Sequence, residues 1–249
     1  MAQKSASDAP NFGFILHPHQ DKIRVPEAAI NYIPQGVPPR RAILAANMET
    51  AVNGVWDGGA GPGDHIAVIG GGVVGLLTAW LAGRIPGTQV TLCDINPTRA
   101  PVAEALGVKF CHPEQLSSHA HGLSEASQDL VFHASASEAG LATALSLAGP
   151  EAKVVEMSWY GDKPISAPLG AAFHPRRLSL ISSQVGNLPT ERRPRWSYGR
   201  RMALALSLLA DPVLDCLITE EVPFEDLPAR LPDILAPDAQ GLMTAVRYR

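Results

Sequence analysis

Short apolar runs alternate with helical patterns through the middle of the chain. The run Ile66–Ile69 precedes the helical run Val73–Leu81, and strand and helix patterns then alternate to about residue 161. Strands that are apolar throughout and separated by helices are typical of a parallel sheet covered on both faces. The expected strands span 66–69, 89–94, 108–111, 129–135, 152–161, 178–185 and 242–248, with shorter ones at 12–16, 22–25 and 163–169; the expected helices span 38–56, 73–81, 96–106, 139–148, 200–210 and 224–235. The pattern therefore predicts an α/β fold with a doubly wound parallel sheet.

The glycines after Ile69 form the pattern Gly70-x-Gly72-x-x-Gly75 between a predicted strand and a predicted helix. In this context the first glycine allows a sharp turn, the second lets a pyrophosphate approach the backbone, and the third lets helix and strand pack closely. The N–H groups that open the helix, at Val73 and Val74, would face the phosphates. We therefore expect a Rossmann-type nucleotide-binding domain.

The next predicted strand ends in an acid, Asp94, which lies 19 residues after Gly75. A spacing of about 20 is expected for the acid that accepts hydrogen bonds from the adenosine ribose. Such a carboxylate repels a 2′-phosphate, so NAD(H) is expected in preference to NADP(H), and the adjacent Ile95 and Arg99 are included in the predicted cofactor site. The alternative is a glycine-rich turn in which Asp94 serves only as a cap.

The carboxyl ends of the predicted strands should line one crevice, because ligands of such sheets bind there. The polar groups available to it are His133, Ser135, Ser137, Ser158 and Tyr160.

Two further groups of residues have open interpretations. His17, His19 and Asp21 are three potential metal ligands in a turn, for which a surface position is favoured and a place at the mouth of the crevice stays open. Five arginines between 192 and 201 either contact an anionic ligand or begin a solvated helix. The stretch 112–128, with His112, His119 and His121, is interpreted as a solvated helix and loop. No metal site is predicted.

Composition narrows the class of protein. The net charge of −4 argues against a general nucleic-acid partner. Three scattered cysteines suit a reducing cytoplasm, so a cytoplasmic location is expected. No apolar run reaches the ~18 residues of a membrane span, and the polar N-terminus has no signal-peptide core.

Several segments together resemble the medium-chain dehydrogenase/reductases, the zinc-type alcohol dehydrogenase group. They are Glu49-Thr50-Ala51, then GPGDHIAVIGGGVVGLL from Gly61, TLCDINPTRAPVAEALGV from Thr91, DLVFHASAS from Asp129 and AGPEAKVVEMSWYG from Ala148. The resemblance implies a Rossmann domain that binds NAD(H) for hydride transfer to or from a small-molecule substrate. It further implies that Thr50, Ala134, Ser135, Ser158 and Trp159 flank the nicotinamide, and that strand 163–169 pairs two subunits in a homodimer.

The departures from that family predict a zinc-independent protein. There is no Gly-His-Glu motif, and Ala46, four residues before Thr50, cannot bind a metal. The resemblance divides the chain into a disordered tail (1–11), a remnant of a GroES-like β domain (12–37), the NAD(P)-binding domain (38–185) and C-terminal helices with a closing strand (186–249). Because most of the GroES-like domain is missing, one wall of the predicted site is absent, and a partner chain that supplies it is an open alternative.

Three functions follow as alternatives. The first is a zinc-independent NAD(H)-dependent oxidoreductase in which Tyr160, His133 or the His17/His19 pair acts as acid or base. The second is a cofactor-binding module without turnover, such as a redox sensor or one subunit of a split enzyme. The third, a methyltransferase-like protein, is less favoured because strand 66–69 has no acidic residue. A short-chain dehydrogenase is disfavoured because Tyr160 and Lys163 are only three residues apart.

Overall fold

Six parallel strands form the central sheet of the computed structural model, which describes residues 12–118, 126–236 and 239–248. The predicted tail at 1–11 and two of the histidines, His119 and His121, lie outside the described residues. The strands are β3 (His65–Ile69), β4 (Gln89–Cys93), β5 (Lys109–Cys111), β6 (Gln128–His133), β7 (Ala148–Glu156) and β8 (Ser179–Ser182). Their order is β5-β4-β3-β6-β7-β8, and every pair is parallel. This confirms the predicted doubly wound α/β sheet, whose strand order reverses between β3 and β6.

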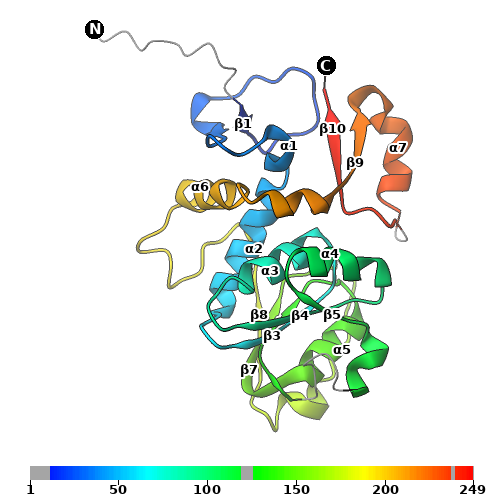
Figure 1. Ribbon diagram of the computed structural model, residues 1–249. Coiled ribbons are helices and arrows are strands. Elements are labelled where there is room, and N and C mark those ends of the chain that lie inside the picture. The colour runs from blue at the N-terminus through cyan, green and yellow to red at the C-terminus, as the bar shows by residue number, and fades with distance from the viewer. Residues whose placement is uncertain (1–11, 119–125, 237–238, 249) are drawn as a thin grey trace.

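Helices cover both faces of this sheet (Figure 1). Helices α2 (Ala45–Gly58), α3 (Val73–Ala82) and α4 (Ala100–Ala105) share one apolar cluster with Ile66 and Val68 of β3. Helix α5 (Glu138–Leu147) packs on the other face, with Ala67 and Ile69. Because alternate residues of a strand point to opposite faces, a strand covered on both sides must be apolar throughout. That requirement explains why continuous apolar runs in the sequence predicted these strands.

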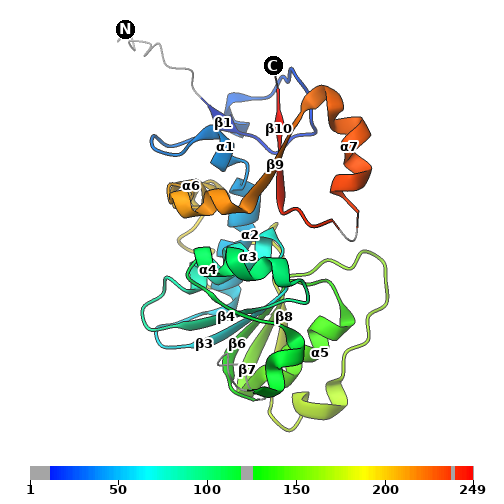
Figure 2. The same ribbon diagram turned by 45° about the vertical axis from the view of Figure 1, so that its right-hand side comes forward.

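The described N-terminal and C-terminal parts of the chain lie on the same side of the sheet, as two views agree (Figure 2). The N-terminal part contains the antiparallel pair β1 (Gly13–Phe14) and β2 (Asn31–Tyr32) and the short helix α1 (Pro39–Ala42). The C-terminal part contains α6 (Tyr198–Leu208), α7 (Leu227–Ile234) and a parallel pair, β9 (Ile218–Pro223) with β10 (Met243–Arg247). The short antiparallel pair lies within residues 12–37, where the sequence analysis expected a small β segment.

Buried arginines attach these outer elements to the sheet layer. Arg201 on α6 is 2% exposed and donates from Nε to Glu49 on α2 (3.1 Å) and from Nη2 to the carbonyl of Val185 (2.6 Å). Arg41 on α1 makes two hydrogen bonds of 2.8 Å to the carboxylate of Asp215. Because a buried charge is stable only when paired, these contacts determine how the outer elements sit on the core.

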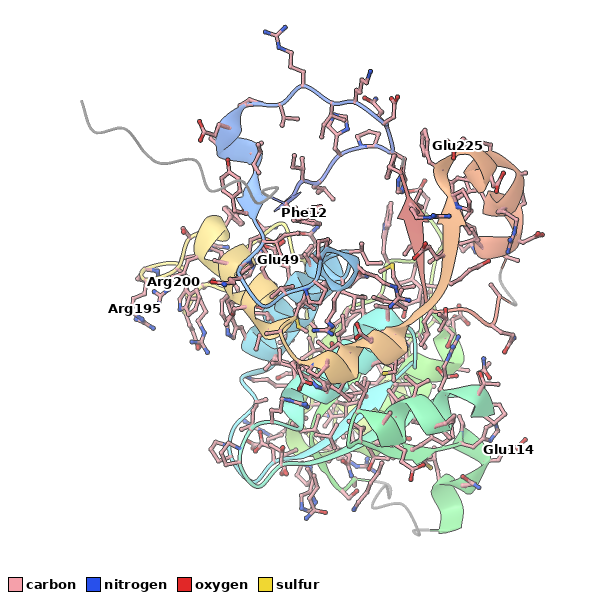
Figure 3. All side chains as sticks on the ribbon, turned by 45° about the horizontal axis from the view of Figure 1, so that its top comes forward. Phe12, Glu49, Glu114, Arg195, Arg200 and Glu225 are labelled. Carbon is pink, nitrogen blue, oxygen red and sulfur yellow. The ribbon has the colours of Figure 1, made fainter. Side chains whose placement is uncertain are left out.

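The arginine-rich segment is split between the interior and the surface. Figure 3 shows Arg195 and Arg200 at the edge of the molecule, away from Glu49, which lies inside near the buried Arg201. Arg200 donates to the carbonyl of Arg195 (2.7 Å) and stacks on the ring of Trp196. None of the five arginines lines the cleft described below, so the structure favours the interpretation of this segment as the start of a helix.

Two predicted strands are wrong. Residues 163–168 have no regular secondary structure, and a π-helical turn follows at Leu169–Phe173. Pro164 and Pro168 have no N–H groups to donate to a sheet ladder, and β8 occupies the edge beside β7 instead. The predicted subunit contact through 163–169 therefore has no strand to form it. Residues 22–25 also form no strand, next to Pro26.

Two other elements differ from the predictions. The helix expected at 38–56 is divided into α1 and α2 by a turn at Ile43 and Leu44. Strand β9 was not predicted, because Thr219, Glu220 and Glu221 interrupt its apolar pattern.

Replacement of Gly75 tests the packing of α3 on β3. A Cβ atom on Gly75 would lie 1.9 Å from the carbonyl oxygen of Gly70, so the glycine turn or the helix must shift. We expect Gly75→Ala to lower the free energy of unfolding by about 1–3 kcal/mol, the usual cost of forced overpacking, measured by urea denaturation. Gly72→Ala is the matched control, since a Cβ there meets no atom within 4 Å. Equal stability of the two variants would contradict this account.

Candidate functional site

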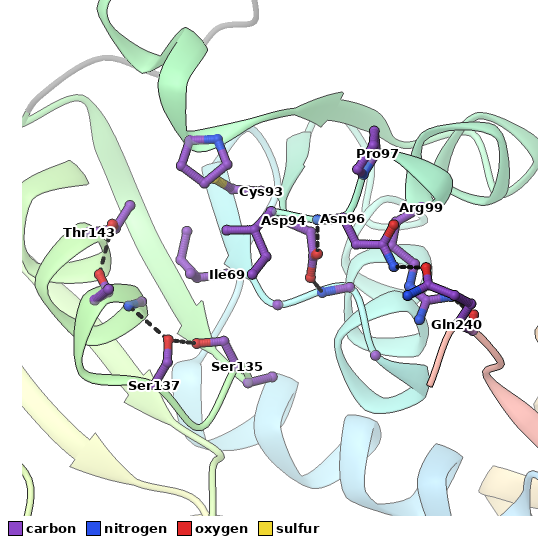
Figure 4. A pocket seen from close by; sticks show the side chains of 18 of the residues that line it. Ile69, Cys93, Asp94, Asn96, Pro97, Arg99, Ser135, Ser137, Thr143 and Gln240 are labelled. Carbon is purple, nitrogen blue, oxygen red and sulfur yellow. Dashed lines mark hydrogen bonds between the residues drawn. The ribbon is translucent and has the colours of Figure 1, made fainter. Parts of the chain in front are cut away.

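A cleft of about 910 Å³ opens at the carboxyl ends of β3, β4 and β6 (Figure 4). This is where ligands bind in open parallel sheets, at the point where the strand order reverses. Its lining comes from the glycine turn after β3, the loop after β4, the loop after β6, the first turns of α5 and a C-terminal segment at Ala239 and Gln240. The cleft therefore joins segments that are far apart in the sequence.

The glycine turn forms the floor of the cleft and needs its glycines for different reasons. Gly70 has a φ of +111°, and a Cβ there would lie 2.7 Å from the backbone of Ala134 and Ser135. Helix α3 starts directly afterwards, with Gly72 as its N-cap. The first N–H groups of a helix have no partner within the helix and attract anions. Because a Cβ at Gly72 would point into open space, the turn has room for a phosphate beside these N–H groups.

Asp94 fixes the adjoining wall. Its Oδ2 accepts a hydrogen bond from the N–H of Gly71, and its Oδ1 accepts one from the N–H of Asn96 (2.7 Å). The carboxylate is thus held by backbone on both oxygens and lines the cleft, where a ribose hydroxyl can reach its remaining lone pairs.

Arg99 also lines the cleft, but its guanidinium is already engaged. It is 9% exposed and donates to the carbonyls of Gln240 (2.9 Å) and Gly241 (3.3 Å). Asn96 donates to the side chain of Gln240 (2.9 Å) as well. The structure therefore makes Arg99 an anchor for the C-terminal segment, in addition to its predicted place beside the cofactor.

A chain of polar side chains lies behind the opposite wall. The Oγ of Ser135 lies 2.9 Å from Ser137 Oγ and 2.7 Å from Nε2 of His133, which is fully buried. The Nδ1 of His133 lies 2.7 Å from Glu156 Oε2, and the hydroxyl of Tyr160 donates to the same oxygen (3.0 Å). Ser135 and Ser137 line the cleft, whereas His133, Glu156 and Tyr160 do not.

The environment shifts the pKa values of two members of this chain. Burial acts to raise the pKa of Glu156, but the hydrogen bond and the charge of His133, together with the N–H of Ser158, lower it overall. Burial and the neighbouring Glu156 carboxylate raise the pKa of Tyr160 to about 12. Glu156 is therefore an anion, and Tyr160 a neutral donor, over the physiological range.

The predicted site residues fall into two groups. Those that line the cleft are Gly70, Gly72, Asp94, Ile95, Arg99, Ala134 and Ser135; those that do not are Thr50, Val73, Val74, Gly75, Ser158 and Trp159. The hydroxyl of Thr50 donates to the carbonyl of Ala46 (3.0 Å), and Trp159 is 89% exposed.

Among the predicted acid–base residues, His133 and Tyr160 come together and His19 stands apart. The Nδ1 of His19 lies 2.6 Å from the hydroxyl of Tyr248 near the C-terminus. Glu156 and Gln240 were missed by the sequence analysis. Glu156 could have been found from the sequence, because it is an acid at the end of the apolar run of β7. No feature of the sequence pointed to Gln240.

Within the described ranges, no group of three or more His, Cys, Asp and Glu side chains is arranged to hold a metal ion. In the same part of the chain, no helix is both long and apolar enough to cross a membrane.

The comparisons with known proteins agree with this geometry. The family model of the alanine dehydrogenase/PNT C-terminal domain matches residues 44–155. An uncharacterized zinc-type alcohol dehydrogenase-like protein of Haemophilus influenzae is 23% identical over 224 residues, which cover 86% of this chain and 60% of that protein. These matches confirm the resemblance to zinc-type alcohol dehydrogenase-like proteins, an NAD(P)-binding oxidoreductase family. The chain spans about 60% of the length of this curated relative.

Solved structures share the fold. A protein described as a short-chain alcohol dehydrogenase from Escherichia coli CFT073, complexed with NADH, has a TM-score of 0.71 and 19% identity, and covers 88% of this chain and 63% of its own. A putative zinc-binding dehydrogenase from Sinorhizobium meliloti, bound to NADP, has a TM-score of 0.73 and 21% identity, with coverages of 89% and 63%.

The lowered pKa of Glu156 predicts a contribution to acid stability. A carboxyl whose pKa is lower in the folded than in the unfolded state stabilises the fold above its ordinary pKa, here 4.5, and loses that effect as the pH falls through the folded value. We expect the stability advantage of the native chain over Glu156→Gln, measured by urea denaturation, to shrink between pH 5 and pH 3. Glu104→Gln, an exposed change on α4, is the control. A constant difference at every pH would show that the ionisation of Glu156 is not involved.

Proposed function

We propose that this relative of the zinc-type alcohol dehydrogenase-like proteins binds NAD(H) and transfers a hydride between the nicotinamide and an alcohol or carbonyl substrate without zinc. The observation that carries the proposal is the cleft itself. It combines an open glycine turn, the N-terminus of α3 and an anchored acid at the carboxyl edge of a parallel sheet. This set of groups fits the pyrophosphate and one ribose of a dinucleotide.

The residues have separable tasks in this proposal. Gly72 and the N–H groups of Val73 and Val74 hold the pyrophosphate, and Asp94 accepts hydrogen bonds from the adenosine ribose. Thr50, Ala134, Ser135, Ser158 and Trp159 keep their predicted place around the nicotinamide. The cofactor itself supplies the hydride acceptor or donor at ring carbon C4.

The preference for NAD(H) over NADP(H) rests on Asp94. Both carboxylate oxygens are held by backbone N–H groups, at Gly71 and Asn96. The negative charge is therefore fixed where a 2′-phosphate would have to stand. Among the described residues, Arg99 is the cation that lines the cleft, and it is bonded to the carbonyls of Gln240 and Gly241.

The proton of the reaction is assigned to the cluster of His133 and Tyr160. His19 is less favoured, because it contacts Tyr248 and does not line the cleft. A second candidate function is binding of NAD(H) without turnover. It is favoured by Ala46 on α2, because this position corresponds to a metal ligand in the zinc-type family and alanine cannot bind a metal. Oxidation of NADH in the presence of a panel of aldehydes and ketones separates the two.

The first measurement is a calorimetric titration with NADH, NADPH and S-adenosylmethionine. We expect NADH to bind best. Asp94→Ala should weaken NADH binding by about 1–3 kcal/mol because charge-assisted hydrogen bonds to the ribose are lost, and it should narrow the gap to NADPH. Asp129→Ala is the matched control, because Asp129 caps the opposite edge of the sheet through the N–H of His65. Unchanged NADH affinity in Asp94→Ala would remove Asp94 from the site, and tightest binding of S-adenosylmethionine would favour the methyltransferase alternative.

Metal analysis tests zinc independence. We expect less than a tenth of a zinc ion per chain after purification, and the same NADH affinity and unfolding midpoint before and after treatment with EDTA. One tightly bound zinc per chain would overturn this part of the proposal.

A further inference from the structure

We infer that Ser135, His133 and Glu156 form a proton relay that opens into the cleft at Ser135. Ser135 is the group that exchanges a proton with the substrate, and His133 and Glu156 are positioning residues that act through it. The inference rests on the proposed hydride transfer and identifies the path of the accompanying proton.

The hydrogen bonds around the imidazole fix its tautomer. Glu156 is an acceptor only, because it is ionised, and its Oε2 lies 2.7 Å from Nδ1 of His133. Nδ1 must therefore carry a proton, and in the tautomer protonated there Nε2 is the acceptor. The hydroxyl of Ser135 lies 2.7 Å from this Nε2. The serine proton consequently points at a base that is held in place from behind by a carboxylate, the arrangement that activates a hydroxyl.

The ladder between β6 and β7 produces this alignment. His133 and Glu156 are direct partners in the parallel pair, so their side chains leave the sheet on the same face. Glu156 is held in turn by the N–H of Ser158 on Oε1 (2.8 Å) and by the hydroxyl of Tyr160 on Oε2 (3.0 Å). Tyr160 thus serves as a donor to the carboxylate, away from the lining of the cleft.

Helix α5 packs directly against the relay. A Cβ on Gly140 would lie 2.1 Å from Ser135 Oγ and 2.8 Å from His133 Nε2, so only glycine lets the helix backbone approach so closely. The N–H of Gly140 donates to Ser137 Oγ (3.0 Å). The Oγ of Ser137 also lies 2.9 Å from Ser135 Oγ, so Ser137 is the polar neighbour of Ser135 on the side of the cleft. The Nε2 side of the buried imidazole therefore reaches the cleft through Ser135, whereas its Nδ1 side contacts Glu156 (2.7 Å) and the hydroxyl of Tyr160 (3.2 Å).

The chemical step balances without a metal. During oxidation of an alcohol, the carbon–hydrogen bond breaks as a hydride leaves for C4 of the oxidised nicotinamide. The substrate hydroxyl gives its proton to Ser135 Oγ, while the serine proton passes to His133 Nε2. A carbonyl, reduced cofactor and an imidazolium paired with Glu156 result, and reduction reverses each transfer.

The titratable groups that face the imidazole are Glu156 and Tyr160, from β7 and the loop after it. From α5, Glu138 acts on Tyr160 by charge, and Ser135 is neutral. Glu156 is the carboxylate in contact with the ring, so it is the group that would pair with an imidazolium formed at His133.

The decisive experiment measures how fast the His133 Nδ1 proton exchanges with solvent, by NMR of the ¹⁵N-labelled full chain. We expect Ser135→Ala to slow this exchange at least tenfold, because protonation of Nε2 through the serine must precede release of the proton on Nδ1. Ser135→Thr should restore the exchange, because the hydroxyl returns. Ser146→Ala is the matched control, since that serine on α5 donates only to the carbonyl of Thr143 and lies outside the cleft lining. Unchanged exchange in Ser135→Ala would overturn the relay.

A second measurement links the relay to the cofactor. The oxidised nicotinamide carries one more positive charge than the reduced ring, and this charge repels a proton on the relay. The protein should therefore take up fewer protons when it binds NAD⁺ than when it binds NADH. Calorimetry in buffers of different ionisation enthalpy counts these protons. Glu156→Gln should make this difference in proton uptake smaller, because an imidazolium formed at His133 loses the carboxylate that pairs with it. No proton difference in the native chain between pH 5 and pH 9 would overturn the inference.

The outcomes separate the relay from the proposed function. Failure of NADH to bind the native chain would defeat the proposed function, whereas normal NADH binding with unchanged proton exchange in Ser135→Ala would defeat the relay alone.

Discussion

The cleft depends on the contact between Gly75 and Gly70. The carbonyl oxygen of Gly70 occupies the space where a side chain of residue 75 would begin. Helix α3 can therefore start directly at the end of β3, with its N–H groups at the carboxyl edge of the sheet. The same turn brings Gly70 against the backbone of Ala134 and Ser135, so it also sets the distance between the two walls.

Polar contacts within the protein carry the rest of the arrangement. Arg201 connects α6 to Glu49 and Asn53 of α2, and Asn53 continues the network to Asp57 and Ser183 at the end of β8. Burial raises the pKa of Asp57 more than Ser183 and Arg201 lower it. A network of this kind selects one arrangement of the outer elements, because any other would leave a charge buried without a partner.

The sequence predicted what is local and missed what depends on register. The glycine turn, the apolar strands and Asp94 were found because each signal lies within some 25 residues. The pairing of His133 with Glu156 was not, because it requires the alignment of β6 on β7, which contains a shift between Gln128 and Leu130. Gln240 was missed for the same reason, since its partners Asn96 and Arg99 are more than 140 residues away. The false strand at 163–169 shows that alternation is a weak signal when prolines occupy the run.

Because Arg99 anchors the C-terminal segment, the binding of a ligand in the cleft is coupled to the docking of that segment. Ala239 and Gln240 form part of the cleft, and Gln240 and Gly241 are held through their carbonyls by a side chain from the wall beneath them. A ligand that contacts Gln240 stabilises the docked state of this segment. The docked segment in turn increases the affinity for the ligand by the same free energy, since thermodynamic coupling is reciprocal. Gln240 and Gly241 thereby become reporters of occupancy, since their protection from hydrogen exchange should rise when a ligand fills the cleft.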